Sequence, residues 1–207
     1  IRFFWPLALI LMTQEFSRPL INLYVSRQSS GPEALAVLAV VYILGRIPYG
    51  WLNDIRNLAS AFREEINSLH YIRRFATGCT LVSLTMMLIC FWTPLREWIL
   101  GDLVGLSPLL VAMSRVPLYI YTGYTFAVAI RGYYEGIALA ERRTPVLAPS
   151  APARLAAIWL SLLVLPYFGV TGAIMGITAL FNGFAIEAAT VWWGVRGYRY
   201  FVAMRQQ

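Results

Sequence analysis

Seven charged residues lie within or at the end of long apolar stretches of the sequence, where a charge is costly. They are two glutamates and five arginines: Glu15, Arg18, Arg46, Arg115, Arg131, Arg154 and Glu187. A charge at the centre of a membrane costs at least about 2.5–3.5 kcal/mol, so such side chains face a protein interior or a water-filled cavity. Because the arginines outnumber the glutamates, ion pairs cannot neutralise them all. The surplus is suited to binding phosphate or carboxylate groups through paired hydrogen bonds.

Helical spacing predicts which of these residues share a face. Residues four apart are neighbours on a helix, and this spacing relates three pairs: Arg18 with Asn22, Tyr42 with Arg46, and Arg115 with Tyr119. Glu15 and Arg18 are three apart and within reach of a direct ion pair. Two roles therefore stay open for Glu15 and Arg18: an internal ion pair that holds helices together, or part of a polar stripe that binds an anion.

The elements that position these residues must be membrane helices. The 207 residues are 59% hydrophobic and 13% charged, whereas an average soluble domain is about 25% charged. Six apolar blocks approach the length of about 20 residues that a crossing needs, and no alternating barrel pattern appears. We expect an all-α integral membrane protein, with residues 1–207 forming a single six-helix bundle. The expected spans are 3–25, 34–52, 75–92, 109–130, 147–167 and 172–195.

Two further features concern the shape of this bundle. Apolar residues at positions 55, 58, 59, 62 and 66 have a one-sided helical spacing, which predicts a short amphipathic helix over about 54–66 at the membrane surface. Prolines kink membrane helices, and broken helices are frequent in transporters. We therefore predict hinges at Pro19, Pro48 and Pro117.

The arginines in the connecting segments predict the orientation. Eleven would lie on one side and two, Arg27 and Arg96, on the other. Because cytoplasmic loops carry the excess of basic residues, we expect a multi-pass protein of the cell membrane with both termini cytoplasmic. The eleven are Arg2, Arg56, Arg63, Arg73, Arg74, Arg131, Arg142, Arg143, Arg196, Arg199 and Arg205.

Motifs for catalysis or cofactor binding are missing from the sequence. All 17 basic residues are arginine, so a Walker A loop is excluded. His70 is the only histidine, and Cys79 and Cys90 form no metal-binding pattern. We expect no enzymatic activity, no metal, no organic cofactor and no nucleic-acid binding. A transporter is favoured over a membrane enzyme or a structural subunit.

Several ordered segments resemble the C-terminal half of the progressive ankylosis protein family. They extend from about Phe4 to Glu187 and read "PLALILMTQEFSRPLINLYVSR", "RIPYGWLNDIRNLASAF", "FWTP", "VLAPSAPARL" and "LSLLVLPYFGVTGAIMG". The resemblance implies a relation to the multidrug/oligosaccharidyl-lipid/polysaccharide (MATE-like) flippases, in which two six-helix bundles face a central cavity. It also implies export of polyanions: pyrophosphate, ATP or citrate. Residues that match family positions are Arg18, Asn22, Arg27, Arg56, Arg131, Arg154 and Glu187.

Three positions depart from the family pattern. Glu15 stands where the family usually has a basic residue, and Arg46 where the animal proteins carry a histidine-like residue. Arg115 lies one turn before the family's basic position, which is Tyr119 here. One turn along a helix keeps the same face, so the charge is expected at a similar place.

These observations predict one half of an alternating-access exporter of polyanions. The substrate would contact Arg18, Asn22, Arg46, Arg115, Tyr119, Arg131 and Arg154, while Glu15 and Glu187 would modulate the charge or carry a coupling proton. The partners would be the lipid bilayer and either an N-terminal six-helix half or a second copy. Two alternatives remain: a flippase for lipids or lipid-linked saccharides, and a scaffold subunit in which every arginine is ion-paired.

Overall fold

A computed structural model describes residues 5–28, 30–62 and 68–205, and this part of the chain is helical without any strand. Short 3-10 or π-helical segments (η) separate several of the α-helices. In chain order the elements are α1 (Trp5–Ser26), α2 (Gly31–Arg46), η1 (Gly50–Asp54), α3 (Ile55–Ala61), α4 (Ser68–Trp92), α5 (Leu95–Trp98), η2 (Ile99–Leu103), α6 (Pro108–Thr122), α7 (Tyr124–Ala140), η3 (Thr144–Leu147), α8 (Ser150–Val164), η4 (Leu165–Phe168) and α9 (Gly172–Arg205).

Three stretches of the described chain are long and apolar enough to cross a membrane, namely His70–Trp92, Thr144–Phe168 and Gly172–Gly197. A fourth is added if the pair Gly31–Arg46 and Gly50–Ala59, which meet at 61°, counts as one broken span. The all-helical fold is thus confirmed for the described residues. By length and composition, three to four of the six expected spans are confirmed.

The other two expected spans are helical but differ from a simple apolar crossing. Helix α1 has 22 residues, but Glu15 and Arg18 at its centre lower its hydropathy. The expected span at 109–130 is divided at Gly123 into α6 and α7, of 15 and 17 residues. A Cβ on Gly123 would lie 2.9 Å from Phe181 of α9, so the break coincides with a close helix contact.

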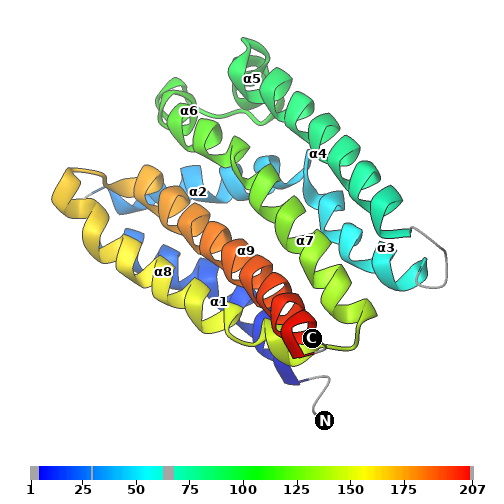
Figure 1. Cartoon of the computed structure of the whole chain (residues 1–207). Coiled ribbons are helices and arrows are strands. Elements are labelled where there is room, and N and C mark those ends of the chain that lie inside the picture. Colours follow the sequence, from blue (N-terminus) through cyan, green and yellow to red (C-terminus); the bar gives the residue numbers. More distant parts are fainter. Residues whose placement is uncertain (1–4, 29, 63–67, 206–207) are drawn as a thin grey trace.

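Helix α9 is the central packing element of the bundle. It contacts α1, α2, α6, α7 and α8, and in Figure 1 it runs between α8 on one side and α7 on the other. Gly176 on α9 is in close contact with Ile21 of α1 and Leu38 of α2, since a Cβ there would lie 3.0 Å from each. Because these helices pack closely on α9, polar side chains from several of them lie next to it.

Helix α3 falls in the segment expected to be amphipathic. Its Ile55 and Ala59 are buried, as a one-sided pattern predicts, and it packs mainly against α7. Gly136 on α7 permits this contact, because a Cβ there would lie 2.7 Å from the Arg56 carbonyl oxygen. The end of the expected helix, including Ile66, lies outside the described residues.

The three predicted hinge prolines occupy different environments. Pro19 lies inside α1 and is exposed, whereas Pro117 lies inside α6 and is buried. Pro48 lies in the turn between α2 and η1, where the two helical pieces meet at 61°. Of the three, Pro48 alone coincides with this large bend.

Candidate functional site

Glu187 of α9 lies at the centre of a buried ionic network. Its side chain is fully buried, and its Oε2 accepts hydrogen bonds from Arg154 Nη1 at 2.6 Å and Arg131 Nη1 at 3.2 Å. Its Oε1 accepts a hydrogen bond from Gln14 Nε2 at 3.1 Å. Arg154 and Arg131 are only 2% and 5% exposed. One carboxylate therefore connects α1, α7 and α8 to α9.

Additional polar groups complete this network. Arg131 Nη2 donates to Asn53 Oδ1 of η1 at 2.8 Å, and Arg154 Nε donates to Ser17 Oγ of α1 at 3.0 Å. Arg131 Nε lies 3.6 Å from Glu135 Oε1, as an ion pair without a hydrogen bond. With two arginines and two glutamates, the network is electrically balanced.

The ring of Phe184 covers both guanidinium groups of this network. Its centroid lies 4.2 Å from Arg154 Cζ and 5.3 Å from Arg131 Cζ. Because Arg131 and Arg154 have carboxylate partners, the surplus positive charge that the sequence predicts lies on other arginines.

Arg18 of α1 is a predicted ligand residue that lies inside the helical bundle and whose guanidinium has no hydrogen-bond partner among the described residues. It is half-buried, and its Cζ lies 5.0 Å from the centroid of the Tyr42 ring on α2. Among the described residues it forms no hydrogen bond and no ion pair. The ion pair with Glu15 that spacing allowed is not formed, because Arg18 turns toward α2 while Glu15 is exposed.

Polar atoms close to Arg18 in the sequence or in space also lack partners. The Tyr42 hydroxyl and the Asn22 Oδ1 atom are buried, and no described residue forms a hydrogen bond with either. A buried polar atom without a partner costs about 1–3 kcal/mol, so such atoms call for an explanation. A ligand that accepts hydrogen bonds would satisfy the Tyr42 hydroxyl and the Arg18 guanidinium together.

A group of tyrosines connects this region to the ionic network. The Tyr49 and Tyr121 hydroxyls lie 3.1 Å apart, and the Tyr121 and Tyr124 rings stack with centroids 4.1 Å apart. The Tyr121 ring packs against Gly45 of α2, and the Tyr124 ring lies with its centroid 5.2 Å from that of Phe184, which covers Arg154. A polar layer thus crosses the bundle from Arg18 to Glu187.

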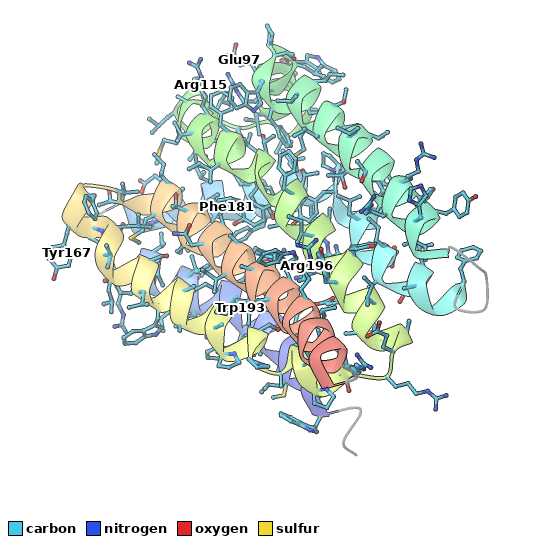
Figure 2. All side chains as sticks on the ribbon, viewed as in Figure 1. Glu97, Arg115, Tyr167, Phe181, Trp193 and Arg196 are labelled. Atoms are coloured by element: carbon cyan, nitrogen blue, oxygen red, sulfur yellow. The ribbon has the colours of Figure 1, made fainter. Side chains whose placement is uncertain are left out.

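The remaining predicted ligand residues do not join this layer. Arg46 is exposed in the last turn of α2. Arg115 and Tyr119 lie on α6, and the Tyr119 hydroxyl oxygen accepts hydrogen bonds from Arg115 and from Arg96 of α5. Figure 2 shows Arg115 and Glu97 at the end of the bundle that carries α5, remote from both termini in Figure 1. The structure therefore divides the predicted set into separate groups.

Sequence reasoning missed several members of these groups. Glu135 is not among the charged residues that the sequence singles out, although its spacing of four from Arg131 is a signal for an ion pair on one helix face. Arg96 was assigned to a connecting segment, yet it is 5% exposed. Gln14, Ser17 and Asn53 are neutral, and no pattern in the sequence distinguishes them from other polar residues.

The comparison with known families identifies a relative for the first part of the chain. Residues 1–93 match the family model of the progressive ankylosis protein (ANKH). This confirms the family resemblance over α1 to α4, the segment that contains Arg18, Asn22 and Tyr42. The family comprises membrane proteins associated with transport of pyrophosphate and other anions. No solved structure matches the chain.

Proposed function

We propose that this chain is one six-helix half of a membrane transporter that exports polyanions such as pyrophosphate, ATP or citrate by alternating access. The observation that carries the proposal is Arg18, a half-buried cation without a carboxylate partner among the described residues, stacked on Tyr42, whose buried hydroxyl also lacks a partner. The family match over residues 1–93 supports an anion as the substrate.

The chemistry of this region suits an oxyanion. The Arg18 guanidinium offers a planar pair of N–H donors, and charge-assisted bonds of this type are about twice as strong as neutral ones. The Tyr42 hydroxyl adds an O–H donor. The Asn22 amide adds an N–H donor if its oxygen and nitrogen are interchanged, an assignment that hydrogen-bond partners decide.

The other predicted residues take supporting roles in this proposal. The balanced network around Glu187 holds α1 against α8 and α9 and thereby positions Arg18. Of the two candidate coupling carboxylates, Glu15 is accessible, whereas Glu187 is enclosed by three donors. A second bundle, arranged as in MATE-like transporters, would close the cavity, and the bend at Pro48 would permit rocking.

The test is an export assay on cells that express the protein. Extracellular pyrophosphate, ATP and citrate are measured for wild type, Arg18→Ala and the matched control Arg74→Ala, an exposed arginine on α4, at equal surface expression. We expect Arg18→Ala to lower export of one anion at least about tenfold, because one charge-assisted hydrogen bond contributes about 1.5–3 kcal/mol. Equal export from Arg18→Ala and Arg74→Ala overturns the proposal.

A groove between α7 and α9 favours a second candidate, a lipid or lipid-linked saccharide flippase. Its volume is about 620 Å³ and its lining is apolar, with Phe126, Ile130, Phe181 and Trp192 among the contacts. Such a groove fits an acyl chain. Transbilayer movement of a labelled lipid in proteoliposomes, reduced by Ala188→Trp, would support the flippase. Lipid movement equal to that in protein-free vesicles would exclude it.

The scaffold alternative is less well supported. It requires that every arginine in the bundle be ion-paired, whereas Arg18 and Arg115 have no carboxylate within ion-pair distance in the described part of the chain. Loss of export in Arg18→Ala would exclude a purely structural role.

A further inference from the structure

Two arginines at the α5 end of the bundle converge on one tyrosine hydroxyl. The Tyr119 hydroxyl oxygen accepts hydrogen bonds from Arg96 Nη1 at 2.8 Å and from Arg115 Nε at 3.1 Å. Their Cζ atoms lie 5.5 and 5.8 Å from the Tyr119 ring centroid. Two like charges held this close repel each other unless an anion is near them.

The hydrogen-bond inventory of this cluster leaves donors without acceptors. A tyrosine hydroxyl both donates and accepts hydrogen bonds, and the Tyr119 oxygen acts as acceptor toward both arginines. The O–H hydrogen of Tyr119 therefore remains free, and no described residue accepts it. Toward the described residues Arg115 donates only through its Nε, so its two terminal nitrogens are open as well. Arg96 Nε is buried and also lacks a partner.

Carboxylates of the described residues only partly balance this cluster. Arg96 Nη2 forms an ion pair with Glu97 Oε1 at 3.1 Å, but the Glu97 side chain is 66% exposed. Glu97 forms no ion pair with Arg115, which has no carboxylate partner among the described residues. Arg96 Nη1, which donates to Tyr119, also donates to the Phe91 carbonyl oxygen at 3.1 Å. A net positive charge remains beside free N–H and O–H donors.

Aromatic packing fixes the position of the Tyr119 ring in this cluster. The Trp92 ring stacks on Tyr119 with centroids 4.5 Å apart, and Trp92 Nε1 donates to Thr122 Oγ1 at 3.2 Å. Trp92 and Trp98 are both more than half exposed. Exposed tryptophans are typical of the level of lipid headgroups.

We propose that Arg96, Arg115 and Tyr119 form a second anion site, which binds a phosphate group and is separate from the Arg18 region. The two terminal nitrogens of Arg115 and the Tyr119 hydroxyl donate hydrogen bonds to the phosphate oxygens, and the buried Arg96 adds a second positive charge. The phosphate comes either from a lipid headgroup at the membrane surface or from a soluble anion. This site does not depend on the export proposal, since none of its residues contacts Arg18.

The test uses purified protein carrying Arg18→Gln, so that binding at the first region does not contribute. Pyrophosphate binding is measured by calorimetry in detergent, and phosphatidic acid binding by native mass spectrometry. Arg115→Gln and Tyr119→Phe are compared with the control Arg74→Gln. Tyr119→Phe keeps the stacking on Trp92, and Arg115 is exposed, so both variants are expected to fold.

We expect both cluster variants to weaken binding of one probe about tenfold or more relative to the control, as loss of a charge-assisted hydrogen bond predicts. Loss of phosphatidic acid alone identifies a lipid headgroup site. Loss of pyrophosphate, alone or together with the lipid, identifies a site open to soluble anions. The proposal is overturned if neither probe binds, or if both bind equally to the cluster variants and the control.

Discussion

Ser17 and Arg18 are adjacent in α1, but their side chains contact different groups of residues. Ser17 accepts a hydrogen bond from Arg154, which also binds Glu187, so this side of α1 belongs to a balanced, buried network. Arg18 faces α2, and its guanidinium lies over the Tyr42 ring without a hydrogen bond or ion pair to any described residue. The arginines of this protein thus divide by partner. Arg131 and Arg154, which pair with Glu187, hold helices together, whereas Arg18, which has no carboxylate partner among the described residues, is available to an anion.

Substitution of Glu187 tests the structural role of the network. In Glu187→Gln the two arginines at 131 and 154 would keep their positive charges with only Glu135 to balance them. Breaking a buried pair by removing one partner costs about 3–5 kcal/mol. We expect a loss of that size in the free energy of unfolding, measured in detergent, whereas Glu15→Gln, an exposed change on α1, should alter it by less than about 0.5 kcal/mol.

A double variant separates charge imbalance from lost packing. Replacing Glu187 by Gln and Arg154 by Met together removes one charge of each sign and leaves Arg131 with Glu135. We expect the double variant to be less destabilised than the sum of the two single variants, with an interaction energy of about 0.5–3 kcal/mol. Simple additivity would contradict the network.

Substitution of Tyr42 distinguishes a ligand-binding hydroxyl from a structural one. Tyr42→Phe removes a buried hydroxyl without a described partner, so the unfolding free energy should stay constant or rise by up to about 1–3 kcal/mol. The ring remains under Arg18. We expect anion export at equal surface expression to fall about tenfold. Export that is unchanged while stability rises would show that the substrate does not use this hydroxyl.

At the scale of elements, the sequence predicts apolar helices well and their interruptions poorly. The expected spans at 75–92, 147–167 and 172–195 coincide with helices long and apolar enough to cross a membrane, because a continuous apolar run has few other solutions. The break at Gly123 was not predicted, since a single glycine within an apolar run is a weak signal. It coincides with a close tertiary contact between Gly123 and Phe181, which sequence periodicity does not contain.

The contact between α3 and α7 depends on a glycine that can be tested directly. A Cβ at Gly136 would lie 2.7 Å from the Arg56 carbonyl oxygen, whereas one at Gly78 on α4 would meet nothing within 4 Å. We expect Gly136→Ala to lower the unfolding free energy by about 1–3 kcal/mol through overpacking. Gly78→Ala should be neutral or stabilising by up to about 1 kcal/mol, because alanine favours a helix. Equal stability of the two variants would mean that α3 does not pack closely on α7.

At the scale of the whole molecule, the sequence predicts that charges are buried but not how they are grouped. Helical spacing related Arg115 to Tyr119 correctly, since both lie on α6. It could not show that Arg96 joins them, because that contact depends on how α5 folds back toward α6. Similarly, Glu187 and Arg154 were identified as intramembrane charges, while their hydrogen bond depends on the packing of α8 against α9. The sequence pattern predicts which residues share a face of one helix, whereas the site is formed where faces of several helices meet.

The outer face of α1 predicts a partner for the bundle. Glu15 is exposed there beside large apolar side chains such as Phe16, which is 60% exposed. A carboxylate facing lipid at this depth costs at least about 2.5 kcal/mol, while the apolar side chains favour contact with protein or lipid over water. Both requirements are met if α1 faces a second bundle across a hydrated cleft. We therefore expect particles in detergent that contain two copies or one copy with an N-terminal half.

Cysteine crosslinking locates this interface. In a Cys79→Ser, Cys90→Ser background, Phe16→Cys on α1 should form crosslinks to the second bundle. Leu81→Cys, exposed on α4, serves as the control, because α4 lies on the other side of α7 from α1 (Figure 1). We expect crosslinked yield from Phe16→Cys to exceed that from Leu81→Cys several-fold, in membranes and before detergent is added. Equal yields, with a particle mass of one chain, would mean that α1 faces lipid and that Glu15 is satisfied by water reaching it from the membrane surface.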